Sequence, residues 1–195
     1  MSSATFSNRP RFVSDESVRA YDGVFVFFHW TIVLLLLVQY LTKPLQWAGV
    51  WPAQSANYWH ISLGPTILLV MVLRLIWRWC RPVPPPPSDL SLELQVVSRS
   101  NHWALYAMVI LQCLGGWFTA SAAGVAPELL GFIRLPLLIP KDPALAHRLG
   151  FWHGLGALLL LALIMAHIAG ALYHALGKRD GVIQRILPFG DPPAV

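Results

Sequence analysis

The feature of the sequence that most constrains its fold is a set of four apolar blocks. They run from about Val24 to Thr42, Ile61 to Cys80, Trp103 to Ser121 and Gly154 to Leu176. Each block is close to the ~20 residues that a helix needs to cross the ~30 Å hydrocarbon core of a bilayer. Backbone groups in lipid must form their hydrogen bonds within their own segment, which favours helices. We therefore predict an all-α integral membrane protein built as a four-transmembrane-helix bundle.

The composition excludes a soluble enzyme. Of the 195 residues, 56% are hydrophobic and 12% are charged, whereas soluble domains have about 45–50% and about 25%. Four spans use about 80 residues, so no connecting segment is long enough for a large catalytic domain. The net charge of +5 is typical of orientation signals and headgroup contact in a membrane protein. Nucleic acid is therefore not expected as a partner.

The chain divides into a helical domain and two short tails. Residues 1–20 are predicted to form a polar cytoplasmic tail, residues 21–187 the four-helix domain, and residues 188–195 a C-terminal tail. Residues 81–89 contain five prolines and are expected to form an extended connector along the membrane surface. The segment from Leu129 to Ile139 is too short to span, and we expect it to lie flat at the interface.

The distribution of basic residues predicts the orientation. Ten Lys and Arg residues belong to the N-terminal tail, the second connection with its flanks, and the C-terminus. The opposite side holds only four, which are Lys43, Arg134, Lys141 and Arg148. The positive-inside rule then places both termini in the cytoplasm (N-in, C-in). The four outer cations are either ordinary loop charge or a means of attracting an anion.

Histidines supply the chemistry of the predicted spans. Aspartate and glutamate are missing from all four blocks, which favours neutral imidazoles as metal ligands over a carboxylate proton relay. His153 and His167 are 14 residues apart. At about 100° and 1.5 Å per residue they share one helix face at a separation of roughly 21 Å. One helix can thus offer a ligand to each of two centres stacked across the membrane.

Depth in the membrane supplies each of these histidines with a partner. His29 and His167 both lie in the cytoplasmic half, and His60 and His153 both lie on the outer side. We predict two haems, each with two axial histidines. Zinc would need further ligands that the pairs lack. The alternative is that the histidines make ordinary polar contacts between helices.

Other polar residues are candidates for contact with the same cofactors. Arg74 follows His60 by 14 residues and reaches the depth of the cytoplasmic haem, where a propionate could accept its hydrogen bonds. Arg78 lies nearly on the same face, and the alternative is that both arginines are interfacial anchors. His102 and His174 are candidates for a cofactor or quinone role, with a plain interfacial position as the alternative for His174. His147 is expected in a loop.

The order of these motifs resembles that of the prokaryotic cytochrome b561 family over about residues 20–187. The matching residues are Tyr21-Asp22, Phe28-His29-Trp30, Trp59-His60-Ile61-Ser62-Leu63-Gly64, Leu73-Arg74-Leu75-Ile76-Trp77-Arg78, His102, Tyr106, Trp152-His153, His167 and His174. The resemblance implies two non-covalent b-type haems with these ligand pairs, and electron exchange with ubiquinone in the inner membrane. It further implies that periplasmic superoxide is oxidised to oxygen while quinone is reduced. The apolar, proline-rich outer connection between the third and fourth blocks departs from the family pattern, at the outer substrate mouth.

Two other functions fit parts of the pattern. The chain could instead be a haem-b anchor subunit linking quinone to a periplasmic dehydrogenase or hydrogenase. A haem-free transporter or scaffold, using the histidines as polar helix contacts, is the third hypothesis. The sequence leaves open the donor, the quinone site and whether the chain forms a homo-oligomer.

Overall fold

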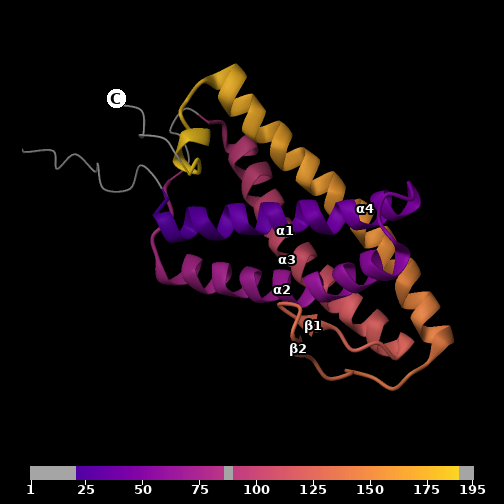
Figure 1. Ribbon diagram of the computed structural model, residues 1–195. Coiled ribbons are helices and arrows are strands. Elements are labelled where there is room, and N and C mark those ends of the chain that lie inside the picture. Colours follow the sequence, from indigo (N-terminus) through magenta and orange to yellow (C-terminus); the bar gives the residue numbers. More distant parts are fainter. Residues whose placement is uncertain (1–20, 86–89, 189–195) are drawn as a thin grey trace, which may run out of the picture.

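Four long helices form the computed structural model, which describes residues 21–85 and 90–188 (Figure 1). They are α1 (Gly23–Trp47), α2 (Ala53–Cys80), α3 (Leu92–Ala123) and α4 (Pro143–Leu172). All four are long and apolar enough to cross a membrane, so the predicted all-α bundle is confirmed. The predicted N-terminal tail, residues 86–89 of the connector and residues 189–195 lie outside the described residues.

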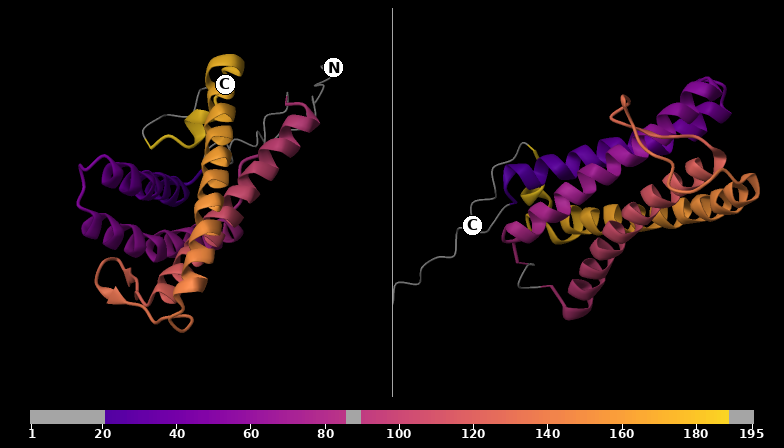
Figure 2. Two further views of the ribbon diagram at one scale, coloured as in Figure 1. Left: turned by 90° about the vertical axis from the view of Figure 1, so that its right-hand side faces the viewer. Right: turned by 90° about the horizontal axis from the view of Figure 1, so that it is seen from below.

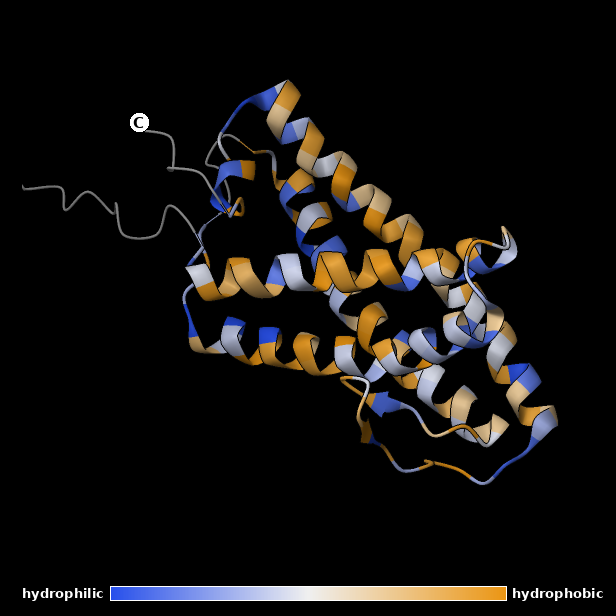
Figure 3. Ribbon diagram, viewed as in Figure 1, coloured by the Kyte–Doolittle hydropathy of each residue, from blue (hydrophilic) through white to orange (hydrophobic). Residues whose placement is uncertain are grey.

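The helices extend beyond the apolar blocks. The second helix begins at Ala53, and α4 begins at Pro143 after the Asp142 side chain, which accepts a hydrogen bond from the Leu145 amide at 3.0 Å. Hydropathy marks only the part of a helix that lies in hydrocarbon, whereas the helix itself continues to a capping residue. The ends of α4 are accordingly more polar than its centre (Figure 3). His147, expected in a loop, lies in α4.

The C-terminal segment folds back against the start of α1. After α4 the chain continues through η2 (Tyr173–Lys178) and η3 (Ile183–Arg185). The Tyr21 amide donates to the Arg185 carbonyl at 3.3 Å, and the Trp30 indole donates to the Ile186 carbonyl at 2.7 Å. Both ends of the described chain therefore lie at one end of the bundle, which we call the His29 end (Figure 1). The opposite end is the His60 end.

Packing follows the order of the helices in the chain. The extensive helix contacts are those of α1 with α2, of α2 with α3, and of α3 with α4. The α3–α4 pair crosses the α1–α2 pair at a steep angle (Figure 2). α4 contacts α1 and α2 less extensively, and the paired histidines lie between α4 and these two helices.

A small apolar core fills the middle of the bundle. Its buried residues come from all four helices: Ile32, Ile67, Met71, Tyr106, Val109, Cys113 and Leu160. Leu160 lies seven residues from both His153 and His167, so the core separates the two histidine levels. Most of the other large apolar side chains are exposed, as expected for helices surrounded by lipid.

A short hairpin occupies the connection between α3 and α4. β1 (Glu128–Leu129) pairs antiparallel with β2 (Ile133–Arg134). Tyr58 of α2 donates to a Glu128 carboxylate oxygen at 2.7 Å, and the Leu130 amide donates to the Thr66 hydroxyl at 3.0 Å. The segment expected to lie flat thus begins as a hairpin held against α2, because polar side chains of that helix satisfy its backbone and its acidic residue.

Candidate functional site

The structure brings the four histidines of the predicted spans together in two pairs. His29 of α1 faces His167 of α4, with ring centres 6.3 Å apart. His60 of α2 faces His153 of α4, with ring centres 6.1 Å apart. We call these the His29 pair and the His60 pair. Since 14 residues separate the two α4 histidines, the pairs are stacked along one helix.

The spacing within each pair fits two axial ligands of one metal ion. A metal–imidazole bond is about 2.0–2.1 Å long, and a ring nitrogen lies about 1.2 Å from its ring centre. Two imidazoles bound to one metal ion from opposite sides would have ring centres about 6.5 Å apart. A direct hydrogen bond would bring the ring centres to about 5.3 Å. The observed 6.1 and 6.3 Å lie closer to the metal-bridged separation than to the directly bonded one.

The donor set also favours haem over a bare ion. Within residues 21–85 and 90–188, no group of three or more His, Cys, Asp or Glu side chains is arranged to hold one metal ion. A pair of imidazoles satisfies haem iron, because the porphyrin supplies the remaining ligands.

α1 holds His60 through two polar side chains. The Thr42 hydroxyl lies 2.9 Å from Nδ1 of His60 and 2.7 Å from the Gln39 carbonyl. The Gln39 side-chain amide donates to the His60 carbonyl at 3.0 Å. Both the ring and the backbone of His60 are thereby fixed, and Nε2 of the ring is left for a ligand.

His153 is held by α3 in a comparable way. The Gln112 side-chain amide donates to the His153 carbonyl at 3.1 Å. The ring of His153 packs on Gly116, where a Cβ atom would lie 3.1 Å from Cε1. Nδ1 of His153 is buried and has no hydrogen-bond partner. The close approach explains why the smallest residue stands opposite the ring.

Arg74 reaches the His29 pair, as its spacing from His60 predicts. Its guanidinium NH2 lies 3.0 Å from Nδ1 of His29. The guanidinium carbon lies 5.1 Å from the Phe25 ring centre and 5.3 Å from that of Tyr106. The Arg74 Nε atom is buried without a hydrogen-bond partner. Among the described residues, this half-buried cation contacts an imidazole and two aromatic rings, and its free Nε donor could bind an anionic group.

Arg78 lies beside Arg74, and its contacts within residues 21–85 and 90–188 are with aromatic rings. Its guanidinium carbon is 5.6 Å from the Trp103 ring centre and 5.7 Å from that of Tyr106. Tyr21, just before α1, also lies within reach of this charge. Burial raises the pKa of the Tyr21 phenol above its ordinary value, although the Arg78 charge opposes that shift. Arg78 therefore adds positive charge to the His29 end.

His102 joins the His29 pair as a third imidazole. Its ring centre lies 5.0 Å from that of His167, with the two rings nearly perpendicular. Its Nδ1 lies 2.6 Å from the Ser98 carbonyl. A carbonyl can only accept, so Nδ1 of His102 carries a proton and Nε2 carries the lone pair.

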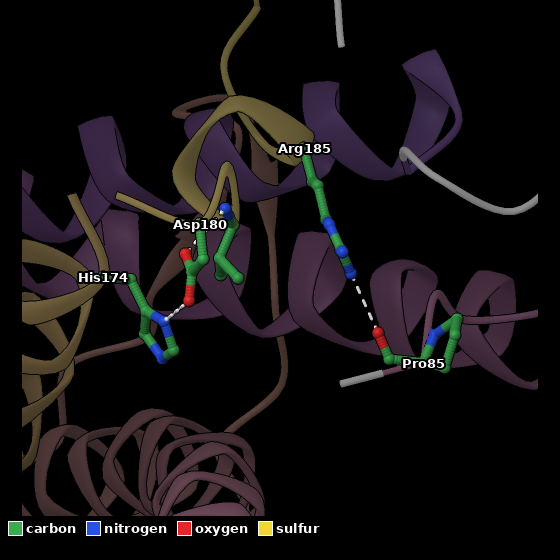
Figure 4. A network of polar contacts seen from close by, with 5 residues as sticks. Pro85, His174, Asp180 and Arg185 are labelled. Carbon is green, nitrogen blue, oxygen red and sulfur yellow. Dashed lines mark hydrogen bonds and ion pairs between the residues drawn. The ribbon is translucent and has the colours of Figure 1, made fainter. Parts of the chain in front are cut away.

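His174 lies away from both pairs, on the surface that the sequence predicts to face the cytoplasm. Its Nδ1 is 2.6 Å from a carboxylate oxygen of Asp180, and Asp180 also accepts from the Val182 amide at 3.2 Å. Nearby, Arg185 donates to the Pro85 carbonyl at 2.8 Å (Figure 4). These contacts tie α4, the C-terminal segment and the connector together. None of the contacts of His174 involves the other candidate histidines.

The four outer basic residues are dispersed at the His60 end. The Lys43 ammonium donates to Asn57 at 2.6 Å and to Gln46 at 3.4 Å. Arg134 lies on the hairpin, Lys141 packs against Gly124, and Arg148 lies on α4. They do not form one cluster around a common point in these contacts, and their role in attracting an anion stays a prediction.

Sequence reasoning missed the residues that hold the His60 pair. Gln39 and Gln112 carry amides inside apolar spans, and such polar residues in a span signal an inward-facing contact. Thr42 and Gly116 carry no comparable signal, because small residues are common in membrane helices. Their contacts with the imidazoles become visible only once the helices are packed.

Comparisons with known proteins identify the family of the chain. The family model described as "Prokaryotic cytochrome b561" matches residues 20–189. The chain is similar to Cytochrome b561 homolog 2 of Escherichia coli (strain K12), with 24% identity over 86% of this chain and 90% of the relative. It is 25% identical to the Probable superoxide oxidase CybB of Yersinia pestis, over 87% of this chain and 97% of that protein. A third relative, Cytochrome b561 homolog 1 of E. coli (strain K12), is 27% identical over 84% of this chain and 94% of its own length.

Proposed function

The chain belongs to the prokaryotic cytochrome b561 family, and we propose that it is a dihaem oxidoreductase of the bacterial inner membrane. In this proposal it takes electrons from superoxide on the periplasmic side and passes them to ubiquinone. Two superoxide ions each lose one electron and leave as oxygen. Ubiquinone gains those two electrons and two protons and becomes quinol. The family implies haem b, and one relative is named a probable superoxide oxidase.

The observation that carries the proposal is the pair of 6.1 and 6.3 Å ring separations at two depths of one bundle. Haem b bound at each pair supplies a one-electron redox centre. His29 and His167 would hold the haem nearer the termini, and His60 and His153 the other. Each pair joins α4 to the α1–α2 side of the bundle, so the ligands also fix the spacing between the two halves.

The surrounding residues would orient the cofactors and exclude water. Arg74 has unused donors beside the His29 pair and would bind a haem propionate there, with Arg78 adding positive charge. Ile67 and Leu160 belong to the buried core between the two levels, which keeps water out of the space that the electrons cross. His102 and His174 remain candidates for contact with haem or quinone at the His29 end.

Orientation of the bundle follows from the distribution of charge. Both ends of the described chain, residues 82–85 of the proline connector and most of the described arginines share the His29 end, so we assign this end to the cytoplasm by the positive-inside rule. The His60 pair then faces the periplasm. Lys43, Arg134, Lys141 and Arg148 would carry positive charge on the side where the superoxide anion arrives.

The first test is a reduced-minus-oxidised visible spectrum of the purified protein, with pyridine haemochrome quantification. We expect two b-type haems per chain, and one haem in each of the variants His29→Ala and His60→Ala. Finding no haem in protein made with an ample haem supply would overturn the redox function and favour a transporter or scaffold. A single haem in the unmutated chain would show that one pair is assigned wrongly.

A second test concerns the donor. Purified chain alone, supplied with superoxide and a soluble ubiquinone, is expected to form quinol at a rate that the His60→Ala variant loses. A chain that holds two haems but stays inert without a co-purifying periplasmic subunit would instead be an anchor subunit.

A further inference from the structure

Thr42 is the polar side chain closest to the ring of His60. It lies in α1 at the His60 end, and it is fully buried, with 0% of its surface exposed. Its hydroxyl oxygen makes two short contacts, at 2.7 Å to the Gln39 carbonyl and at 2.9 Å to Nδ1 of His60. A hydroxyl has one proton, so it can donate a hydrogen bond to only one of these two partners and must accept from the other.

Only one proton arrangement makes both contacts hydrogen bonds. The Gln39 carbonyl oxygen has no proton and can only accept, so the hydroxyl proton of Thr42 belongs to that contact. The hydroxyl oxygen can then only accept a hydrogen bond from His60, so Nδ1 of His60 must be the donor. A neutral imidazole carries one N–H. Nε2 of His60 is therefore left with a lone pair.

The backbone contact reinforces this orientation. Gln39 precedes Thr42 by three residues on the same face of α1, and its side-chain amide donates to the His60 carbonyl at 3.0 Å. α1 thus fixes His60 at the main chain and at the ring, while the partner ligand His153 belongs to α4. The ring has little freedom to turn Nδ1 toward the position between the two histidines.

We propose that Thr42 is a positioning residue that holds His60 in the tautomer protonated at Nδ1 and presents Nε2 to the haem iron. This proposal rests on the proposed function. A hydrogen bond from a ligand imidazole to an acceptor raises the basicity of the ligand, and loss of such a partner typically costs about 10–100-fold in metal affinity. Because a more basic ligand favours ferric over ferrous iron, Thr42 also lowers the reduction potential of that haem.

The test compares Thr42→Val, which removes the hydroxyl at nearly constant shape, with Thr42→Ser, which keeps it. Redox titration followed in the visible spectrum would give the midpoint potentials of both haems. In Thr42→Val we expect the midpoint potential of one haem to rise by at least 59 mV, which corresponds to a ten-fold loss of preference for the ferric form. The midpoint potential of the other haem should be unchanged. Thr42→Ser should match the unmutated protein.

A matched control uses a half-buried threonine at the same end. The Thr119 hydroxyl of α3 donates to the Gly115 backbone carbonyl at 2.7 Å, as the Thr42 hydroxyl does to Gln39, and within the described residues it makes no hydrogen bond to a histidine. Thr119→Val should leave both potentials unchanged. Equal shifts in Thr42→Val and Thr42→Ser, or no shift in either with both haems bound, would overturn the proposal. Loss of one haem in Thr42→Val but not in Thr42→Ser would support it.

A measurement on the unmutated apoprotein avoids any folding defect of the variants. Nitrogen-15 NMR of labelled imidazoles reports which ring nitrogen carries the proton, and the His60 signals can be identified by their loss in His60→Ala. A proton on Nδ1 supports the role of Thr42, and a proton on Nε2 overturns it. Absence of haem from the loaded protein would count against the proposed function and leave this NMR result unaffected.

Discussion

The His60 pair and the His29 pair share a ring spacing but differ in what surrounds them. The hydrogen bonds at the His60 pair involve neutral side chains: the Thr42 hydroxyl accepts a hydrogen bond from Nδ1 of His60, and two glutamine amides donate to the histidine carbonyls. The His29 pair is surrounded by cations and aromatic rings. Arg74 lies 3.0 Å from Nδ1 of His29, and arginine can only donate. The proton of His29 therefore sits on Nε2 in this arrangement.

The two pairs therefore differ in which ring nitrogen carries the proton and which has a lone pair to offer a metal. Nε2 of His60 already offers a lone pair, whereas Nε2 of His29 offers one only after Arg74 leaves Nδ1. An anionic propionate is an acceptor that would draw the guanidinium away. If haem binds at the His29 pair as proposed, we expect Arg74 to move away from Nδ1 of His29, and we expect no such movement at the His60 pair.

Removing the ligands on α4 should have the largest effect and tests whether the pairs are independent. His153→Ala and His167→Ala are each expected to reduce the haem content from two to one per chain, because each removes one axial ligand from one pair only. Pyridine haemochrome quantification measures the content. A variant that loses both haems, although it remains folded by circular dichroism, would show that the two pairs form a single unit.

Neutralising Arg74 should affect the His29 pair alone. In Arg74→Gln the haem at this pair is expected to bind about ten-fold more weakly, since a charge-assisted hydrogen bond contributes about 1.5–3 kcal/mol. Its potential should fall, because loss of a nearby positive charge favours ferric iron. Haem-transfer kinetics and redox titration measure the two effects.

The control for this change is Arg74→Lys, which keeps the charge and should preserve most of the potential. A rise in potential in Arg74→Gln, or a change confined to the other haem, would contradict the assignment of Arg74 to the His29 pair.

Crowding the ring of His153 should have a smaller effect, confined to the His60 pair. In Gly116→Ala the added Cβ lies 3.1 Å from Cε1 of His153, so the ring must shift by a few tenths of an ångström. Overpacking of this kind costs about 1 kcal/mol or more, and we expect weaker haem binding there. Gly64→Ala is the matched control, since its Cβ meets nothing within 4 Å. Equal haem affinities in the two variants would show that the contact is unimportant.

Replacing His102 should have the smallest effect and sharpens the description of the His29 pair. His102→Phe keeps a ring beside His167 but removes the lone pair on Nε2. We expect a small change in the low-spin electron paramagnetic resonance signal of one haem, with the haem content still at two. A lost haem would mean that His102, rather than His29 or His167, supplies an axial ligand.

The sequence was sufficient for the helices. The histidines that it pairs by depth have neighbouring rings in the structure, and their role as haem ligands stays a prediction. Long apolar blocks specify spans almost without regard to tertiary contacts, and depth along a helix is a simple count of residues. The contacts of Thr42 and Gly116 were not predictable, because they depend on the rotation of one helix against another. The hairpin at Glu128 was missed for a similar reason, since it is held by Tyr58 and Thr66 of a helix some 60 to 70 positions away in the chain.

The fold-back of the C-terminal segment has a consequence for biosynthesis. Arg185 and Ile186 bond to Tyr21 and Trp30, so the described residues made last are joined to those made first. A chain emerging from the ribosome at about 5–20 residues per second cannot form these bonds until all four helices have been synthesised. The end of the bundle that carries His29 is therefore sealed only after translation of the helical domain is complete.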